Sequence, residues 1–145
     1  MIEIYIGSDH AGYKLKQAVK KHLEEKKIKI TDLGSFSGEA SVDYPIIARE
    51  VCEKVLEYPN SMGIMICGTG QGSAMMCNRK KRIRAALCNT VYLAEMARSH
   101  NYANVLCMGE RTTAEPLALE IVDKFLDTKP DTEERHKKRV DMFDK

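Results

Sequence analysis

Short apolar runs and amphipathic stretches alternate from one end of the chain to the other. The apolar runs predict strands over residues 2–7, 28–33, 62–66, 83–87 and 105–108. After the first run, Leu15, Val19 and Leu23 recur at helical spacing, with lysines on the opposite face. The intervening segments predict helices over residues 13–27, 44–58, 71–80, 90–100 and 115–126, and a charged segment at 131–143 predicts one more.

Strands that alternate with helices favour an α/β fold, in which helices cover both faces of a parallel sheet. No repeat or linker interrupts the pattern, so residues 1–145 are predicted to form a single domain. With the common strand order 2-1-3-4-5, ligands bind in the crevice between strands one and three. Polar residues and glycines follow both strands, as Ser8-Asp9-His10 and Cys67-Gly68-Thr69-Gly70.

A glycine loop, Cys67-Gly68-Thr69-Gly70-Gln71-Gly72, follows the third predicted strand. Such a loop before a helix turns successive backbone N–H groups toward one point, where they bind a phosphate or the oxyanion of a reaction intermediate. Three familiar uses of glycine loops do not fit. A dinucleotide site needs an acidic residue closing the next strand, which here ends in Leu87-Cys88-Asn89-Thr90. Ser73 stands where a Walker loop has its lysine and where a cysteine phosphatase has its arginine.

Composition narrows the class of protein further. The net charge of +2 gives little reason to expect nucleic acid, and no apolar run approaches the roughly 18 residues of a membrane helix. The chain enters a strand pattern directly after Met1, which predicts no signal peptide. The 5 cysteines are odd in number and never spaced C-x-x-C, which favours reduced thiols in a cytoplasmic protein over disulfides or a zinc site.

Each candidate residue also has a purely structural interpretation. Cysteine is often a small buried hydrophobe, and we interpret every cysteine except Cys67 in that way. Cys67 differs because the loop amides that follow it favour its thiolate. Asp9 is alternatively a helix cap, and His100-Asn101 a helix stop with a cation near the negative end of the dipole.

The chain also contains two basic runs. Residues 79–84 are interpreted as a solvated loop. Arg135 and Arg139 are four residues apart, hence on one helical face, and paired guanidinium groups suit a phosphate. An exposed charged tail is the alternative for the second run.

In combination, these motifs resemble the ribose-5-phosphate isomerase B family of sugar-phosphate isomerases. The resemblance covers essentially the whole chain in order, and it rests on Ser8-Asp9-His10-Ala11-Gly12, Asp43-Tyr44-Pro45, Cys67-Gly68-Thr69-Gly70-Gln71-Gly72, Ser99-His100-Asn101, Gly109-Glu110-Arg111 and Arg135-His136-Lys137-Lys138-Arg139. It implies a three-layer α/β/α Rossmann-like sandwich with a five-stranded sheet. It also implies a homodimer or homotetramer whose sites lie at the dimer interface, with residues from both chains at each site.

The resemblance further implies that the chain interconverts ribose 5-phosphate and ribulose 5-phosphate through an enediolate, a step of the pentose phosphate pathway. Cys67 would move the carbon-bound proton, His100 would assist opening of the sugar ring, and Asp9 and Thr69 would handle the hydroxyl protons. The substrate-binding residues implied are His10, Tyr44, Gly68, Gly70, Gln71, Gly72, Asn101, Arg111, Arg135 and Arg139. Neither a metal nor a cofactor is implied, because preformed amide dipoles stabilise the oxyanion.

A thiol base raises one difficulty, because an ordinary thiol is only about a few per cent ionised near neutrality. Some family members carry a glutamate in the glycine loop where this chain has Ser73, so Cys67 is the base expected here. Two alternatives stay open: an isomerase of galactose 6-phosphate or allose 6-phosphate, and a non-catalytic phosphosugar-binding module. Sugar length depends on loops such as residues 35–43.

Overall fold

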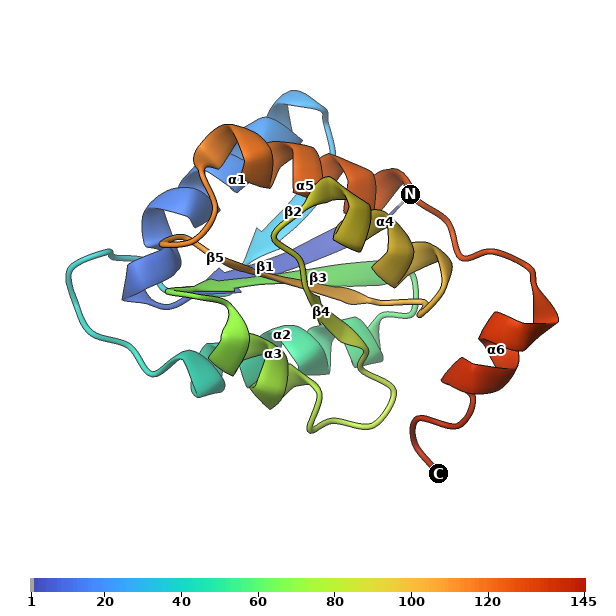
Figure 1. The fold of residues 1–145 in the computed structure, drawn as a ribbon. Helices are drawn as coiled ribbons and strands as arrows, with labels where there is room; N and C mark the ends of the chain where they lie inside the picture. The colour runs from blue at the N-terminus through green and yellow to red at the C-terminus, as the bar shows by residue number, and fades with distance from the viewer. Residues whose placement is uncertain (1) are drawn as a thin grey trace.

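A five-stranded sheet lies at the centre of the molecule (Figure 1). The structure is a computed structural model that describes residues 2–145. The strands are β1 (Glu3–Ser8), β2 (Lys29–Asp32), β3 (Ser61–Cys67), β4 (Ala85–Leu87) and β5 (Val105–Gly109). Every pairing between neighbouring strands is parallel, which confirms the predicted α/β class.

The strand order is β2-β1-β3-β5-β4, so the predicted order 2-1-3-4-5 is wrong for the last two strands. β5 is buried along its whole length, whereas β4 is three residues long and ends at the exposed Leu87. The longer and more apolar strand therefore takes the interior position, and the short one forms the edge. β1 and β3 are neighbours as predicted, with Ser8 in register with Ile66.

Helices cover both faces of the sheet (Figure 1). Their bounds are α1 (Tyr13–Glu25), α2 (Tyr44–Glu57), α3 (Gln71–Cys77), α4 (Val91–Ser99), α5 (Glu115–Asp127) and α6 (Glu134–Val140), and a single 3₁₀ turn spans His10–Gly12. One apolar core lies between the sheet and α1, α4 and α5, and a second lies between the sheet and α2 and α3. None of the helices that the structure describes is long and apolar enough to cross a membrane.

The last helix is shorter than the predicted segment 131–143. The amide of Asp131 donates to the carbonyl of Ser99 at the end of α4, and its side chain accepts from the amide of Glu133. These bonds hold the start of the segment in a non-helical conformation beside α4, and the helix begins only at Glu134. α6 then extends away from the body of the domain (Figure 1).

Lys16 is a residue of α1, and its side chain is fully buried against the carboxyl end of β2. Its Nζ lies 2.7 Å from Asp32 Oδ1 and also donates to the carbonyl of Ser35, and Lys20 binds the other oxygen of Asp32 at 2.9 Å. Burial lowers the pKa of the Lys16 ammonium. Burial also opposes ionisation of Asp32, but the hydrogen bonds from Lys16, Gly34 and Lys20 outweigh it and hold the pKa of the Asp32 carboxyl below its ordinary value. The pair thus depends on both partners remaining charged.

We expect Asp32→Asn to lower the free energy of unfolding at neutral pH by roughly 3–5 kcal/mol, because it leaves a buried ammonium without its carboxylate. Because the folded-state pKa of Asp32 lies below the unfolded value of about 3.9, the difference from wild type should shrink as the pH falls below that value. Urea unfolding at several pH values measures both effects. Glu53→Gln is the control: its carboxylate pairs with Lys80 at the surface, so it should cost about 1 kcal/mol or less.

Candidate functional site

The first group of predicted site residues lies at the carboxyl edge of the sheet, where β1 and β3 end side by side. Asp9 is 7% exposed, and its amide donates to the carbonyl of Ile66 at 3.3 Å. Its Oδ1 accepts from the amide of Gly12 at 3.0 Å and caps the 3₁₀ turn. The capping interpretation of Asp9 is therefore confirmed. Within residues 2–145 the second carboxylate oxygen has no recorded partner, so it remains available beside the end of β3.

His10 lines a cavity of about 660 Å³ together with Arg111 and the loop residues 36–39. Its Nδ1 accepts a hydrogen bond from the amide of Val42 at 3.2 Å. In the neutral ring, the proton therefore resides on Nε2, and that atom is the free donor. The structure thus gives His10 a fixed tautomer that suits an anionic ligand.

Cys67 is the last residue of β3 and is 5% exposed. Side chains alternate along a strand, so Cys67 shares the face of Met65, which α2 and α3 cover. This face carries the glycine loop at the start of α3, so the thiol lies on the same side of the sheet as that loop.

The remaining cysteines fit the structural interpretation, since all are free and buried. Hydrogen bonding to Cys77 and burial raise the pKa of the Cys52 thiol. Burial raises the pKa of Cys88 to about 12. Both thiols therefore stay protonated, as inert core residues do.

The glycines of the loop allow close approach by side chains from other elements. A Cβ on Gly72 would lie 2.5 Å from the hydroxyl oxygen of Tyr44, and a Cβ on Gly68 would lie 2.9 Å from a guanidinium nitrogen of Arg111. Gly70 has φ +82°, a left-handed conformation that favours glycine. Tyr44 and Arg111 thus pack directly against the loop.

Thr69 is one of two exposed residues of this loop, together with Gln71. Its hydroxyl oxygen accepts from the amide of Gln71 at 3.4 Å. Within the part of the chain that the structure describes, the amides of Thr69 and Gly70 have no recorded acceptor. Two backbone donors are therefore available to a bound oxyanion.

β5 supports the loop from the other side, which sequence reasoning did not anticipate. The amide of Glu110 donates to the carbonyl of Cys67, and the amide of Arg111 donates to the carbonyl of Gly68, both at 3.0 Å. A carboxylate oxygen of Glu110 also accepts from the amide of Leu15 at 2.8 Å and caps α1. The sequence contained a signal for this role, because Gly109-Glu110-Arg111 follows a strand, but the predicted strand order put β4 in place of β5 beside β3.

The second group of predicted site residues lies at the opposite edge of the sheet. His100 and Asn101 follow α4, which returns the chain to the amino ends of the strands, where the carbonyl of Asn104 accepts from the amide of Gly63 near the start of β3. Arg135 and Arg139 lie on α6, close to His100 rather than to the glycine loop. The structure of one chain therefore brings together Asp9, His10, Tyr44, Cys67, Thr69, the glycines, Gln71 and Arg111, and it separates His100, Asn101, Arg135 and Arg139 from them.

His100 contacts two residues that sequence reasoning missed. Its ring stacks on that of His136, with centroids 4.0 Å apart, and its Nε2 lies 3.7 Å from Asp131 Oδ2. The same oxygen lies 2.7 Å from His136 Nδ1. No sequence pattern connects these residues, because the contact forms only when the chain after α5 folds back against the end of α4.

His100, Asp131 and His136 are the group that could hold a metal ion among the residues that the structure describes, since their ligand atoms lie within 4.8 Å of one another. The guanidinium of Arg135 lies beside them, with its Nε 3.5 Å from His136 Nε2. A neighbouring positive charge repels a cation, and it suits an anionic substrate instead.

The chain is similar to known sugar-phosphate isomerases. The model of the ribose/galactose isomerase family matches residues 4–143. A probable ribose-5-phosphate isomerase B of Mycoplasma pneumoniae is 44% identical over 137 residues, which make up 94% of this chain and 90% of the relative. A solved ribose 5-phosphate isomerase from Thermotoga maritima is 44% identical with a TM-score of 0.94, covering 98% of this chain and 97% of its own. Ribose-5-phosphate isomerase B from Mycoplasma genitalium, solved with bound ribulose-5-phosphate, is 39% identical with a TM-score of 0.92, covering 97% of this chain and 92% of its own. The chain belongs to the ribose/galactose isomerase family, as its motifs indicated.

Proposed function

We propose that this chain is an aldose–ketose isomerase that interconverts ribose 5-phosphate and ribulose 5-phosphate. The observation that carries the proposal is the meeting of Asp9, Cys67 and the glycine loop at the carboxyl edge of β1 and β3. An acid–base pair beside free amides is what proton transfer through an enediolate requires. The bound ribulose-5-phosphate of the Mycoplasma genitalium relative supports this choice of substrate.

Each group at this edge has a role in the proposed reaction. The Cys67 thiolate removes the proton from carbon two and returns it to carbon one, while Asp9 and Thr69 exchange the hydroxyl protons. The loop amides stabilise the negative enediolate oxygen, and one such donor is worth about 3 kcal/mol in a transition state. His10 donates to the phosphate through Nε2, with Arg111 as a further contact, and Tyr44 holds the sugar. No metal or cofactor takes part.

The reaction also needs the residues at the opposite edge, and we propose that a second copy of the chain supplies them. His100 of that copy assists ring opening, Asn101 holds the sugar, and Arg135 and Arg139 bind the phosphate. A two-fold symmetric dimer completes two sites, because each chain gives one group and receives the other.

Exposed apolar side chains support this assembly. Met75 on α3 and Tyr92 on α4 are each 66% exposed, and Leu87 and Leu93 are also exposed nearby. They lie around β4, the edge strand of the sheet, whose free side would otherwise remain open to solvent. Apolar side chains beside an open edge strand are typical of a protein–protein interface. We propose a homodimer, or a tetramer built from it, in the cytoplasm, where the five free cysteines remain reduced.

The function is tested by offering ribose 5-phosphate, allose 6-phosphate and galactose 6-phosphate to the metal-stripped protein and measuring ketose formation. We expect turnover of ribose 5-phosphate, and we expect Cys67→Ala to abolish it while leaving phosphosugar binding largely intact. Faster turnover of a six-carbon substrate would assign the chain to the other branch of the family. Binding of all three without turnover would identify a non-catalytic module, and full activity in Cys67→Ala would exclude the thiol as the base.

Arg139→Ala should raise KM for ribose 5-phosphate by about ten-fold or more with little change in kcat, because a hydrogen bond to a charged group is worth about 1.5–3 kcal/mol. Arg139 is exposed on α6 and has no recorded carboxylate partner among residues 2–145, whereas Arg135 binds Glu133 at 2.9 Å. Lys138→Ala, the neighbouring exposed cation, is the control and should leave KM unchanged. Equal effects of the two variants would indicate general charge attraction in place of a specific phosphate contact.

The shared site is tested by mixing two inactive variants. Cys67→Ala and His100→Ala homodimers should each be inactive, but in a mixed dimer one of the two sites keeps both native residues. After unfolding and refolding of an equal mixture, about a quarter of wild-type activity should return, as random pairing in two-fold dimers requires. No recovery, together with mixed dimers detected by native mass spectrometry, would show that Cys67 and His100 act within one chain.

A further inference from the structure

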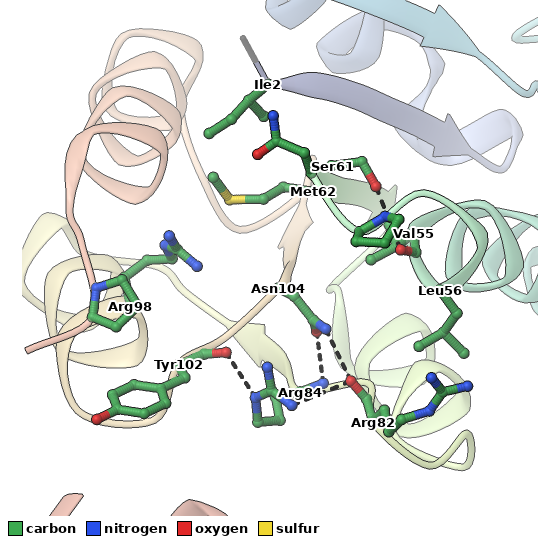
Figure 2. Close-up of a pocket in the computed structure, with 13 residues that line it drawn as sticks. Ile2, Val55, Leu56, Ser61, Met62, Arg82, Arg84, Arg98, Tyr102 and Asn104 are labelled. Atoms are coloured by element: carbon green, nitrogen blue, oxygen red, sulfur yellow. Dashed lines mark hydrogen bonds between the residues drawn. The ribbon is translucent and has the colours of Figure 1, made fainter. Parts of the chain in front are cut away.

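The loop of residues 100–104 begins with His100 and Asn101, and two of its later residues, Tyr102 and Asn104, line a cavity of about 570 Å³ at the amino edge of the sheet (Figure 2). Arg84 and Arg98 also line this cavity. The two arginines come from different elements: Arg84 immediately precedes β4, and Arg98 lies in the last turn of α4. Their guanidinium groups bind backbone carbonyls, those of Tyr102 and Arg82 in the case of Arg84 and those of Ala103 and Thr128 in the case of Arg98.

Arg84 binds the loop and the residues just before β4, but not the segment that leads to α6. Its Nε donates to the carbonyl of Tyr102 at 2.7 Å, and a terminal nitrogen donates to the carbonyl of Arg82 at 3.3 Å (Figure 2). The amide of Arg84 donates to Asn104 Oδ1 at 2.8 Å, and Asn104 Nδ2 donates to the carbonyl of Arg82 at 2.9 Å. The end of the loop is therefore fixed to the start of β4.

Arg98 binds both the loop and the segment that leads to α6. A terminal nitrogen donates to the carbonyl of Ala103 at 2.6 Å, and Nε donates to the carbonyl of Thr128 at 3.2 Å. Its guanidinium also lies over the ring of Phe125, 5.6 Å from the centroid. One side chain thus connects the residues after His100 to the chain that leads to Arg135 and Arg139.

Tyr102 also binds the segment after α5, residues 128–140, which carries α6 and is called the α6 tail below. The contact is made by its side chain. Its backbone is left-handed, with φ 52°, a conformation that few non-glycine residues adopt. In this conformation its carbonyl accepts from Arg84, and its hydroxyl donates to the carbonyl of Asp131 at 2.9 Å. The phenol therefore contributes a contact to the tail that is separate from the contact of Arg84 to the loop.

Neither guanidinium has a carboxylate within salt-bridge distance among residues 2–145, although Asp144 contributes at longer range to Arg84. Burial lowers the pKa of both groups, and the charge of Arg84 lowers that of Arg98 further. Two half-buried like charges are costly to place together, and the backbone carbonyls are the groups that compensate them. The guanidinium groups are therefore held by the backbone carbonyls of the loop and of the segment after α5, and they fix the position of both.

We infer that Arg84 and Arg98 are positioning residues of the isomerase: Arg84 aims the His100 loop, and Arg98 sets that loop and the α6 tail relative to each other. The inference rests on the proposed function, in which His100 opens the sugar ring and the α6 arginines bind the phosphate. Arg84 holds the loop, the Tyr102 hydroxyl holds the α6 tail, and Arg98 holds both. Loss of the Arg84 contact should therefore change kcat, loss of the Tyr102 contact should change KM, and loss of the Arg98 contacts should change both.

Methionine approximates the unbranched, apolar stem of the arginine side chain and removes its charge and its donors. Arg84→Met should lower kcat by about ten-fold or more while leaving KM within about two-fold, since small misplacements of a catalytic group have large effects. Tyr102→Phe, which loses only the bond to the tail, should raise KM several-fold at unchanged kcat. Arg98→Met should do both. The measurements are steady-state kinetics with ribose 5-phosphate, with the dimer content of each variant checked by size exclusion.

Arg49→Met is the matched control, because Arg49 is exposed on α2, and it should leave both constants unchanged. If a methionine variant fails to fold, Arg84→Lys and Arg98→Lys retain the charge on a single donor nitrogen and should show the same division with smaller changes. Changes in kcat and KM that go together in all three variants, or variants that lose thermal stability at wild-type kinetics, would overturn the inference. An inactive wild-type protein would instead overturn the proposed function.

Discussion

A parallel sheet places the residues that follow its strands at one edge and the residues that follow its crossing helices at the other. Cys67 ends β3 and Asp9 follows β1, whereas His100 follows α4. The residues at the carboxyl edge and those at the amino edge are therefore separated by the length of the strands. No rotation of a side chain can bring them together. If both take part in one reaction, a second chain is required by topology alone.

The position of β5 has a similar consequence for the glycine loop. Because β5 and not β4 pairs with β3, the residues after β5 reach the loop, and the amides of Glu110 and Arg111 bind its carbonyls. A Cβ on Gly109 would lie 2.5 Å from Thr69 Cα, so a glycine there permits the loop to pack against the end of β5. The edge strand β4 has no comparable role at the loop. The strand order thus determines both what supports the loop and which strand forms the open edge of the sheet.

The class of fold, the neighbouring positions of β1 and β3 and the residues of the carboxyl edge could be predicted from the sequence. These features depend on local patterns, namely apolar runs, helical spacing and the residues that end each strand. The order of β4 and β5 could not be predicted, because the sequence shows both as short apolar strands. Which of them takes the interior position depends on how each packs in the folded sheet. The contact of His100 with Asp131 and His136 could not be predicted either, because it depends on how the segment after α5 folds back against the end of α4. The guanidinium contacts of Arg84 and Arg98 go to backbone carbonyls, which have no sequence signature. Residue roles at the site stay predictions until they are measured.

Several candidate residues use one polar atom for structure and leave another free. Asp9 caps a turn with one oxygen, and His10 accepts from Val42 through Nδ1 while Nε2 remains unoccupied. The structural and functional interpretations of these residues are therefore not alternatives. A side chain held by one atom has fewer orientations to lose when it binds a ligand with the other, so the cap contributes to preorganisation as well as to folding. Thr69 follows the same rule, since its hydroxyl accepts from Gln71 and retains its own proton for donation. Fold and chemistry thus share the same side chains at this edge, which is why the motifs that predicted the turns also marked the site.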